Sequence, residues 1–269
     1  MFALSEADLR LRILSCADGP ASFNAESTQR GTAVVSVDPL YRLDARTIRD
    51  RIAATRDQIL EQTQRNRPQF VWDTIGSVGE LGRTRIQAMQ AFLDDYDSGK
   101  RQGRYVDAEL PSVALPDQSF DLAVCSHFLF LYTEQLSEAF HRCAIFELCR
   151  LAPEVRIFPL LALNGRPSPY VATIVDHLSD YWEVSLETVP YEFQRGGNQM
   201  MRVRPLQNGK QKTGCEPLAV SQPSDPAPDH RTQCCTSRCG GDEQRLSQSG
   251  QNVSRGITQS RSNQIRRLG

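Results

Sequence analysis

The chain has 269 residues, of which 39% are hydrophobic and 23% are charged, and its formal net charge is −1. This length and apolar content can build one large hydrophobic core or two small ones. The near-neutral charge gives no clear nucleic-acid-binding patch. The opening stretch, MFALSEADLRLR, carries acids early and has no long apolar run, so we expect neither a signal peptide nor a membrane anchor, and a cytoplasmic protein.

Short apolar runs and long helical patterns alternate in the first half of the chain. Strands are predicted at residues 11–17 and 33–38. Two helices follow, over 44–66 and 80–100, whose apolar residues recur at helical spacing. The segment 42–103 that contains them is far longer than one connecting helix requires, so it is predicted to be a helical insertion between the second and third strands. Long insertions at the ligand-facing end of a sheet often form lids or substrate walls.

The second half continues the alternation and closes differently. Further strands are predicted at 104–108, within 119–132, and at 154–161, 182–193 and 199–205. Helices are predicted at 133–152, with Thr133 as N-cap, and at 168–181. The sequence QRGGN is predicted to join the last two strands as a hairpin. Together these elements predict an α/β fold with a doubly wound sheet and a C-terminal antiparallel strand pair.

The first strand runs into a turn, ILSCADGPASFNAE, that contains one glycine, Gly19. Turns of this kind hold nucleotides in doubly wound sheets, where ligands bind beyond the carboxyl ends of the strands. Asp38 ends the second strand about twenty residues later, the spacing of a ribose-binding carboxylate. The alternative is that Asp38 only starts the turn DPLY, since Asp is common before Pro in turns.

The most informative stretch is VDAELPSVALPDQSFDLAVCSHFLFLY, residues 106–132. Asp107 follows the third strand and is placed to accept a hydrogen bond from the exocyclic amine of a base, while the backbone N–H of Ala108 can donate to a ring nitrogen. Ser126 and His127 stand where the fourth strand ends and the following loop begins.

These pieces resemble the class I S-adenosylmethionine-dependent methyltransferases, over roughly residues 10–205. The matching segments are RILSCADGPASF, VVSVDPLY, the block 106–132, LCRLAPEVRIFPLL and the final strand pair. The resemblance implies a Rossmann-like seven-stranded sheet, S-adenosyl-L-methionine as cofactor, and one methyltransferase-like domain over residues 1–205.

The cofactor contacts that the resemblance implies fall at four strand ends. They are Asp18, Gly19, Pro20, Asp38, Pro39, Asp107, Ala108 and Ser126. Members of this group usually show an acid followed by Gly-x-Gly-x-Gly at the first turn. Here Ser15 stands at the acid position, and Ala17 and Ala21 replace the outer glycines. Asp18 is the candidate to substitute for the missing acid toward the methionine amino group.

Methyl transfer from a sulfonium is an in-line displacement, so proximity and alignment supply most of the rate. A base is needed only where the acceptor must lose a proton, and His127 is the candidate for that role, with Tyr41 and Tyr132 behind it. The structural alternative for His127 is a packed or capping histidine at a strand end.

The function predicted is a methyltransferase that acts on a small-molecule or unidentified acceptor. Two alternatives stay open: a non-catalytic protein that keeps the fold with a degenerate cofactor turn, and an NAD(P)-dependent oxidoreductase. The missing glycines count against the second, because a pyrophosphate needs close approach to the backbone. The oligomeric state is left open.

Two loops are candidate walls of the acceptor site. The first contains Phe70 and Trp72, which either line the substrate or anchor the insertion to the core. The second, after the fifth strand, contains Asn164, Gly165 and Arg166, which either shape the acceptor pocket or form a plain Asn-Gly turn.

Composition changes at residue 206, and the segment 206–269 is rich in Ser, Gln, Gly, Pro and Arg. Such a segment cannot bury enough apolar surface to offset the entropy of ordering, so a disordered tail is predicted. Its cysteines and histidine lack the paired spacing of a structural zinc site, and no metal is predicted; they are Cys215, Cys234, Cys235, Cys239 and His230. The other four cysteines fall in apolar segments and are expected to pack as small hydrophobes; they are Cys16, Cys125, Cys143 and Cys149.

Overall fold

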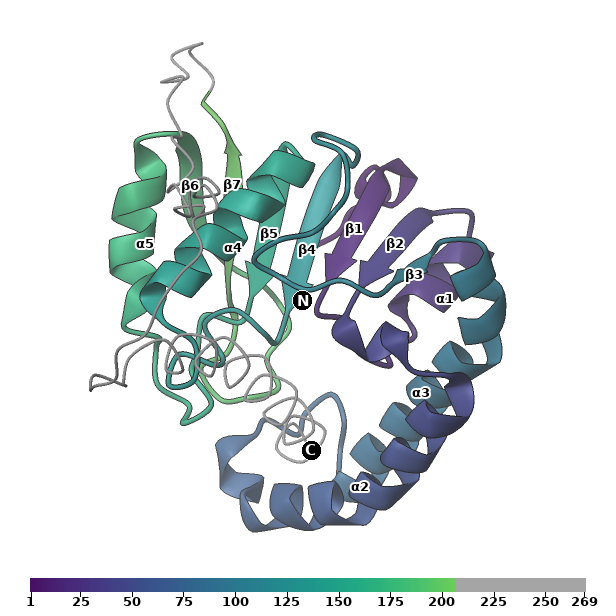
Figure 1. Ribbon diagram of the computed structural model, residues 1–269. Coiled ribbons are helices and arrows are strands. Elements are labelled where there is room, and N and C mark those ends of the chain that lie inside the picture. Colours follow the sequence, from purple (N-terminus) through teal and green to yellow (C-terminus); the bar gives the residue numbers. More distant parts are fainter. Residues whose placement is uncertain (207–269) are drawn as a thin grey trace, which may run out of the picture.

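A computed structural model of the protein describes residues 1–206. Its centre is a seven-stranded sheet of order β3-β2-β1-β4-β5-β7-β6 (Figure 1). The strands are β1 (Arg12–Cys16), β2 (Ala33–Val37), β3 (Tyr105–Val106), β4 (Leu122–Ser126), β5 (Glu154–Phe158), β6 (Trp182–Thr188) and β7 (Gln199–Pro205). The pairs from β3 to β5 are parallel, and β7 runs antiparallel to both β5 and β6. The predicted fold class is therefore confirmed, including the closing antiparallel pair.

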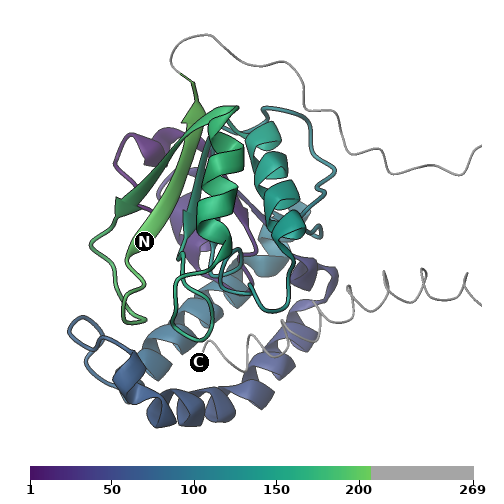
Figure 2. The ribbon, with the colours of Figure 1, turned by 90° about the vertical axis from the view of Figure 1, so that its left-hand side faces the viewer.

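Helices cover both faces of the sheet and extend beyond one end of it. They are α1 (Phe23–Gln29), α2 (Ala45–Arg65), α3 (Val78–Arg101), α4 (Glu138–Leu151) and α5 (Tyr170–Ser179), with short 3-10 turns η1 (Asp8–Arg10), η2 (Pro39–Arg42) and η3 (Arg67–Gln69). Right-handed crossovers from β1 to β2 and from β4 to β5 leave in opposite directions, which puts α1 and α4 on opposite faces (Figure 2). In the described part of the chain, no helix has both the length and the apolar character to cross a bilayer.

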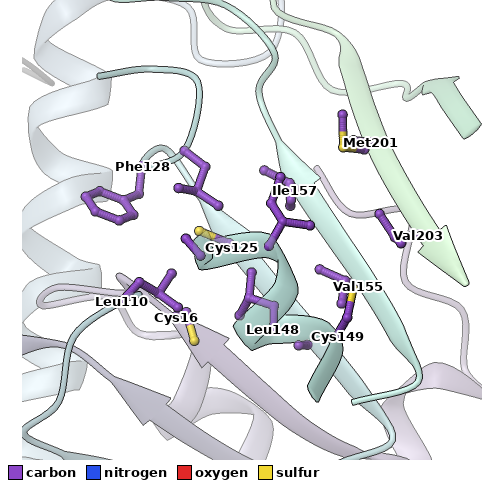
Figure 3. Packing of buried hydrophobic residues seen from close by; sticks show 14 of the residues in the cluster. Cys16, Leu110, Cys125, Phe128, Leu148, Cys149, Val155, Ile157, Met201 and Val203 are labelled. Atoms are coloured by element: carbon purple, nitrogen blue, oxygen red, sulfur yellow. The ribbon is translucent and has the colours of Figure 1, made fainter. Parts of the chain in front are cut away.

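The main core lies between the central strands and α4 (Figure 3). Leu148 of α4 and Val155 and Ile157 of β5 have no exposed surface, because these strands are covered on both faces. Cys16 and Cys125 stand opposite each other on β1 and β4 and are both buried, as expected of small hydrophobes. Cys143 departs from that expectation, because it lies on the exposed side of α4.

The helical insertion is present as predicted, and α2 and α3 form a long pair beyond the ends of the strands (Figures 1 and 2). Its base is held by four packed aromatic rings, which we call the base cluster: Tyr41, Phe92, Tyr96 and Tyr105. The hydroxyl of Tyr96 and the ammonium of Lys100 both donate to the carbonyl of Tyr41, at 2.9 and 2.6 Å. The insertion is therefore continuous with the sheet at this end.

The far end of the insertion is fastened to the loop between β6 and β7. The ring of Phe193 stacks on Phe70 with centroids 4.8 Å apart and meets Trp72 edge-on at 5.6 Å. The amide of Val71 donates to the carbonyl of Phe193 at 2.7 Å, and that of Arg195 to the carbonyl of Gln69 at 2.9 Å. Phe70 and Trp72 therefore anchor the insertion, and Phe70 also lines the cavity, so the two interpretations are compatible for Phe70; we call this contact the tip clasp.

One helix start is wrong in the prediction. Helix α4 begins at Glu138, and its N-cap is Ser137, whose hydroxyl accepts from the amide of Phe140, rather than Thr133. The hydroxyl of Thr133 instead donates to the carbonyl of Phe130 and pairs with that of Ser168. The apolar run that precedes it is buried as an irregular loop, which holds the chain out of the helix for four more residues.

The closing hairpin also differs from the prediction. Strand β6 ends at Thr188 instead of continuing to residue 193, and the connection runs over 189–198 rather than over QRGGN alone. Pro190 has no N–H for the ladder, and the backbone of Phe193 pairs with the tip clasp instead of with β7. The segment predicted as a disordered tail lies outside the described residues, apart from Leu206.

Candidate functional site

The turn after β1 is held in a backbone conformation that normally favours glycine. Ala17 and Gly19 have φ of +61° and +58°, and the amide of Ala17 donates to the carbonyl of Val37 at 2.9 Å. A Cβ at Gly19 would meet no atom within 4 Å, so the backbone there faces open space. The chain thus makes an open turn at the switch point of the sheet although it has lost two of the three expected glycines.

Asp18 points back toward the two strands that flank the turn. Its carboxylate accepts from the hydroxyl of Ser15 at 2.8 Å and from that of Ser36 at 2.6 Å. Burial, together with the nearby charge of Asp38, raises the pKa of Asp18 to about 6 in spite of these hydrogen bonds. The Asp18 carboxyl thus lies beside Ser15, which stands where relatives carry their acid.

Asp38 connects the second strand to the same turn. One carboxylate oxygen accepts from the amide of Gly19 at 3.0 Å, and the other from the amide of Leu40 at 2.8 Å. The hydroxyl of Tyr41 donates to the carbonyl of Gly19 at 2.8 Å, so both backbone polar groups of that glycine are fixed from the β2 side. Asp38 also N-caps η2, which means that the turn interpretation and the site interpretation of this residue describe the same side chain.

A cavity of about 1300 Å³ lies between the carboxyl ends of the strands and the insertion. The sheet side of its lining includes most of the predicted site residues, namely Asp18, Gly19, Pro20, Asp38, Pro39, Ser126 and His127. The opposite side comes from η2, α2 and α3, and the tip clasp contributes Phe70 and Phe193. Because the insertion is fixed at both ends, it spans the cavity as an arch.

His127 follows β4 and adopts φ of +51°, an uncommon value for a residue with a side chain. Its amide donates to the carbonyl of Phe158 at 2.7 Å, and its Nδ1 lies 2.6 Å from the hydroxyl of Ser126. Burial, with a smaller effect from the cation of Arg85, lowers the pKa of His127 to about 4. The imidazole is therefore neutral at pH 7, and its low pKa makes it a weak base.

The structure does not bring Asp107 and Ala108 into the cavity lining. Asp107 lies at the surface and pairs with Arg42 across 3.5 Å. Arg42 itself lines the cavity, so Asp107 stands directly behind one of its walls. The adenine contacts at these two residues stay a prediction.

Of the other candidate residues, some line the cavity and some do not. Asn164 lines the cavity, and its side chain donates to Glu134 at 3.2 Å and accepts from the amide of Arg166 at 2.9 Å, which makes the predicted Asn-Gly turn. Tyr41 is buried as a turn support, and burial raises its pKa well above the usual range. Tyr132 is buried outside the cavity lining.

The sequence did not single out Arg85 of α3 or Tyr191 of the β6–β7 loop, which line the cavity near His127. The rings of His127 and Tyr191 both meet Phe158 edge-on, at 5.7 and 5.9 Å. Both residues enter through long-range contacts of the arch, for which the sequence carries no local signal. Within residues 1–206, no group of three His, Cys, Asp or Glu is placed to hold a metal ion, and the tail cysteines and His230 lie outside that range.

No protein-family model matches the chain. The chain is 32% identical over 206 residues to the uncharacterized protein MJ0045 of Methanocaldococcus jannaschii, across 76% of this chain and 90% of that protein. It belongs to the same family. The likeness extends over nearly all of the M. jannaschii protein, so the family relation covers the sheet and the arch rather than one motif.

Solved structures with a similar arrangement include PH0226 from Pyrococcus horikoshii OT3, with 11% identity, a TM-score of 0.39, and coverage of 73% of this chain and 82% of that one. Magnesium protoporphyrin IX methyltransferase from Synechocystis PCC 6803 is 12% identical, with a TM-score of 0.39 and coverage of 74% of this chain and 73% of that one. A SAM-dependent methyltransferase from Aquifex aeolicus is 13% identical, with a TM-score of 0.35 and coverage of 75% of this chain and 83% of that one. These scores are low, and the methyltransferase fold is assigned here from the strand order and the antiparallel β7.

Proposed function

We propose that this protein is an S-adenosylmethionine-dependent methyltransferase that transfers a methyl group to a small-molecule acceptor. The observation that carries the proposal is the hydrogen bond between Asp38 and the amide of Gly19, at the edge of a large cavity. It joins the ends of β1 and β2 in a sheet whose order and antiparallel β7 are those of this enzyme class. Ligands of doubly wound sheets bind at this switch point.

The residues present fit such a cofactor. The backbone at Gly19 faces open space, which leaves room for a ligand against the turn. The amides of Gly19 and Leu40 fix the Asp38 carboxylate at the cavity lining, and a carboxylate held there is the usual acceptor for the hydroxyl groups of a ribose. Asp18 would face the methionine amino group, whose positive charge would favour the ionised form of this carboxyl.

When bound, S-adenosylmethionine supplies an electrophilic methyl group on sulfur. The chain contributes orientation, through the turn at Gly19 and through Asp38, and an arch that covers one side of the cavity. His127 is neutral at pH 7, and its Nδ1 is oriented by the hydroxyl of Ser126, but a pKa of about 4 makes it a weak base, so it would serve an acceptor whose proton is itself acidic.

Calorimetry with S-adenosylhomocysteine, S-adenosylmethionine and NAD tests this assignment. We expect saturable binding of the first two and none of NAD. Asp38→Ala should weaken S-adenosylhomocysteine binding by roughly 1.5–3 kcal/mol for each charge-assisted hydrogen bond lost. The control is Asp176→Ala, an exposed residue of α5 outside the cavity, which should bind as the wild type does.

The outcomes separate the alternatives. Binding of NAD alone would favour the oxidoreductase. Folded protein that binds none of the three would contradict both enzyme hypotheses and leave a non-catalytic member of the fold. If S-adenosylhomocysteine binds, transfer of tritiated methyl groups to fractions of a cell extract, ordered by size, tests for activity and for a small acceptor.

A further inference from the structure

The arch side of the cavity carries charge of one sign. Between residues 42 and 89 the lining includes five arginines and, among the residues that the structure describes, no Asp or Glu; the arginines are Arg42, Arg51, Arg56, Arg65 and Arg85. The sheet side carries the acids Asp18, Asp38 and Glu134 instead. A cavity with one cationic wall concentrates anions and holds them against that wall.

Arg85 differs from the arginines at the rim. Arg42, Arg56 and Arg65 each pair with a carboxylate. Arg85 is half-buried, and within residues 1–206 no carboxylate contributes to its electrostatic surroundings, only the neighbouring Tyr191. Burial without a counter-ion lowers the pKa of Arg85 to about 10, and it still carries its charge at pH 7.

A desolvated guanidinium without an acid is unfavourable unless a ligand completes it. Its planar fork binds carboxylate and phosphate groups through two parallel hydrogen bonds. Arg83, two residues earlier on α3, shows the ordinary case, because it is exposed and forms an ion pair with Glu80. The difference between these two arginines points to an anion at the cavity side of α3.

The same wall is apolar between its charges. Side chains that line the cavity from α2 and α3 are Ile52, Ile59, Leu60, Ile86 and Met89, and the tip clasp adds Phe70 and Phe193. A small hydrophilic anion would leave this surface against water. A ligand with an apolar body and an anionic end would cover both parts of the wall.

The cavity also has room for such a ligand beside a cofactor. Its volume of about 1300 Å³ exceeds the roughly 300–1,000 Å³ of common ligand pockets. Arg85 lies on the arch, whereas Gly19 and Asp38 lie on the sheet, so the two groups of residues face the cavity from opposite sides. His127 is close enough to Arg85 for the guanidinium charge to lower its pKa.

We propose that the arch binds the methyl acceptor, and that this acceptor has an apolar body and a terminal oxyanion, a carboxylate or a phosphate, that pairs with Arg85. That this ligand accepts a methyl group rests on the proposed function, whereas its binding to the arch does not. With the oxyanion at Arg85, the adjoining part of the ligand lies near His127 and faces the sheet wall.

The experiment is calorimetry at pH 7.5, without cofactor, with decanoate, decyl phosphate and decanol, each below the concentration at which it self-associates. These probes share one apolar body and differ in the end group. We expect at least one of the two anions to bind saturably and about tenfold or more tighter than decanol. Comparing the anions distinguishes a carboxylate site from a phosphate site.

Variants test whether Arg85 is responsible. Arg85→Gln should lower the affinity for the preferred anion about tenfold or more and leave decanol binding unchanged, which also shows that the variant is folded. Arg85→Lys keeps the charge without the planar guanidinium, so it should lose less affinity for the anion than Arg85→Gln does. Arg83→Gln, on the same helix but outside the cavity, should bind as the wild type does.

The proposal is overturned if both anions bind no tighter than decanol, or if Arg85→Gln binds the anion as tightly as Arg83→Gln does. Titration of S-adenosylhomocysteine into the same preparations keeps the two proposals apart. In the wild-type protein, S-adenosylhomocysteine binding without preferential anion binding refutes only the acceptor class, and anion binding without S-adenosylhomocysteine binding refutes only the cofactor.

Discussion

The sheet wall of the cavity carries three carboxylates, Asp18, Asp38 and Glu134, whereas the arch wall, within the part of the chain that the structure describes, carries five arginines and no acid. The sheet wall is made of short turns fixed by buried hydrogen bonds between adjacent strand ends. The arch is made of two long helices that contact the rest of the chain at their base, through α1, β3 and the base cluster, and at the tip clasp. In the proposed function, the wall of hydrogen-bonded turns binds the cofactor, and the wall fastened at its ends binds the second ligand.

This contrast agrees with how α/β enzymes divide their work, since scaffolds position a constant group and added segments select the second ligand. It also predicts that the arch can be loosened without loss of the sheet.

The base of the arch has no spare room. A Cβ on Gly99 would lie 2.4 Å from Cε2 of Tyr105 and 2.9 Å from Cζ of Arg104. Gly99→Ala should lower the free energy of unfolding by roughly 1–3 kcal/mol, because overpacking forces neighbouring groups to move. Urea denaturation measures the change.

Gly79→Ala is the matched control on the same helix, because a Cβ there would meet only the Oγ of Ser77, at 3.8 Å. It should be neutral or stabilising by up to about 1 kcal/mol. Equal changes in the free energy of unfolding of the two variants would show that contact with Tyr105 does not set the effect.

On the sheet wall, burial and the charge of Asp38 raise the pKa of Asp18 to about 6, above the roughly 3.9 of an unfolded chain. Between these values the folded protein binds a proton that the unfolded chain does not, so stability from this group is full below about pH 4 and is lost as the pH rises through 6. Asp18→Asn removes that loss. The variant should be more stable than the wild type by about 1 kcal/mol at pH 7.5 and equal to it at pH 4. Thermal melts at the two pH values check this, and a pH-independent difference would contradict it.

The tip clasp should open before the base does. Phe193→Ala removes the stack on Phe70 and the edge contact with Trp72, at a cost of about 1 kcal/mol. We expect faster hydrogen exchange at the amide of Val71, which donates to the carbonyl of Phe193. The amide of Ile13 in β1 should exchange as in the wild type, and equal acceleration there would mean that the arch and the sheet unfold together.

The smallest effect concerns the two walls across the cavity. Burial and then Arg85 lower the pKa of His127 to about 4, so stability from this neutral imidazole is full above about pH 6.5 and is lost as the pH falls through 4. Arg85→Gln should move the pKa of His127 upward, toward its ordinary value, as measured by NMR titration of the ring protons. Arg83→Gln should leave it in place, and no difference between the two would separate Arg85 from the site.

Much of this architecture could be predicted from the sequence, because its signals are local. The short apolar runs marked the strands, and the length of 42–103 with its helical spacing marked the arch. Asp38 was found because it directly follows a strand, and the parallel sheet brings strand ends together whatever the details of packing.

Where the prediction failed, long-range contacts decided the outcome. Thr133 and Ser137 are both ordinary N-caps, and only the burial of the preceding loop and the bond to Ser168 favour Ser137. Strand β6 ends early because Phe193 pairs with the arch. The sequence does not distinguish Arg85 for the same reason: on α3 it resembles Arg83, and only the packing of the arch makes one a half-buried cation at the cavity and the other a surface ion pair.

A crystal structure of the protein grown with saturating S-adenosylhomocysteine tests the central claim most directly. The account predicts the ligand against the turn at Gly19, with ribose hydroxyls within about 3.2 Å of the Asp38 carboxylate, and the cavity beside Arg85 left for a second molecule. A ligand bound on the arch away from Asp38, or a cavity without the ligand at saturating concentration, would contradict it.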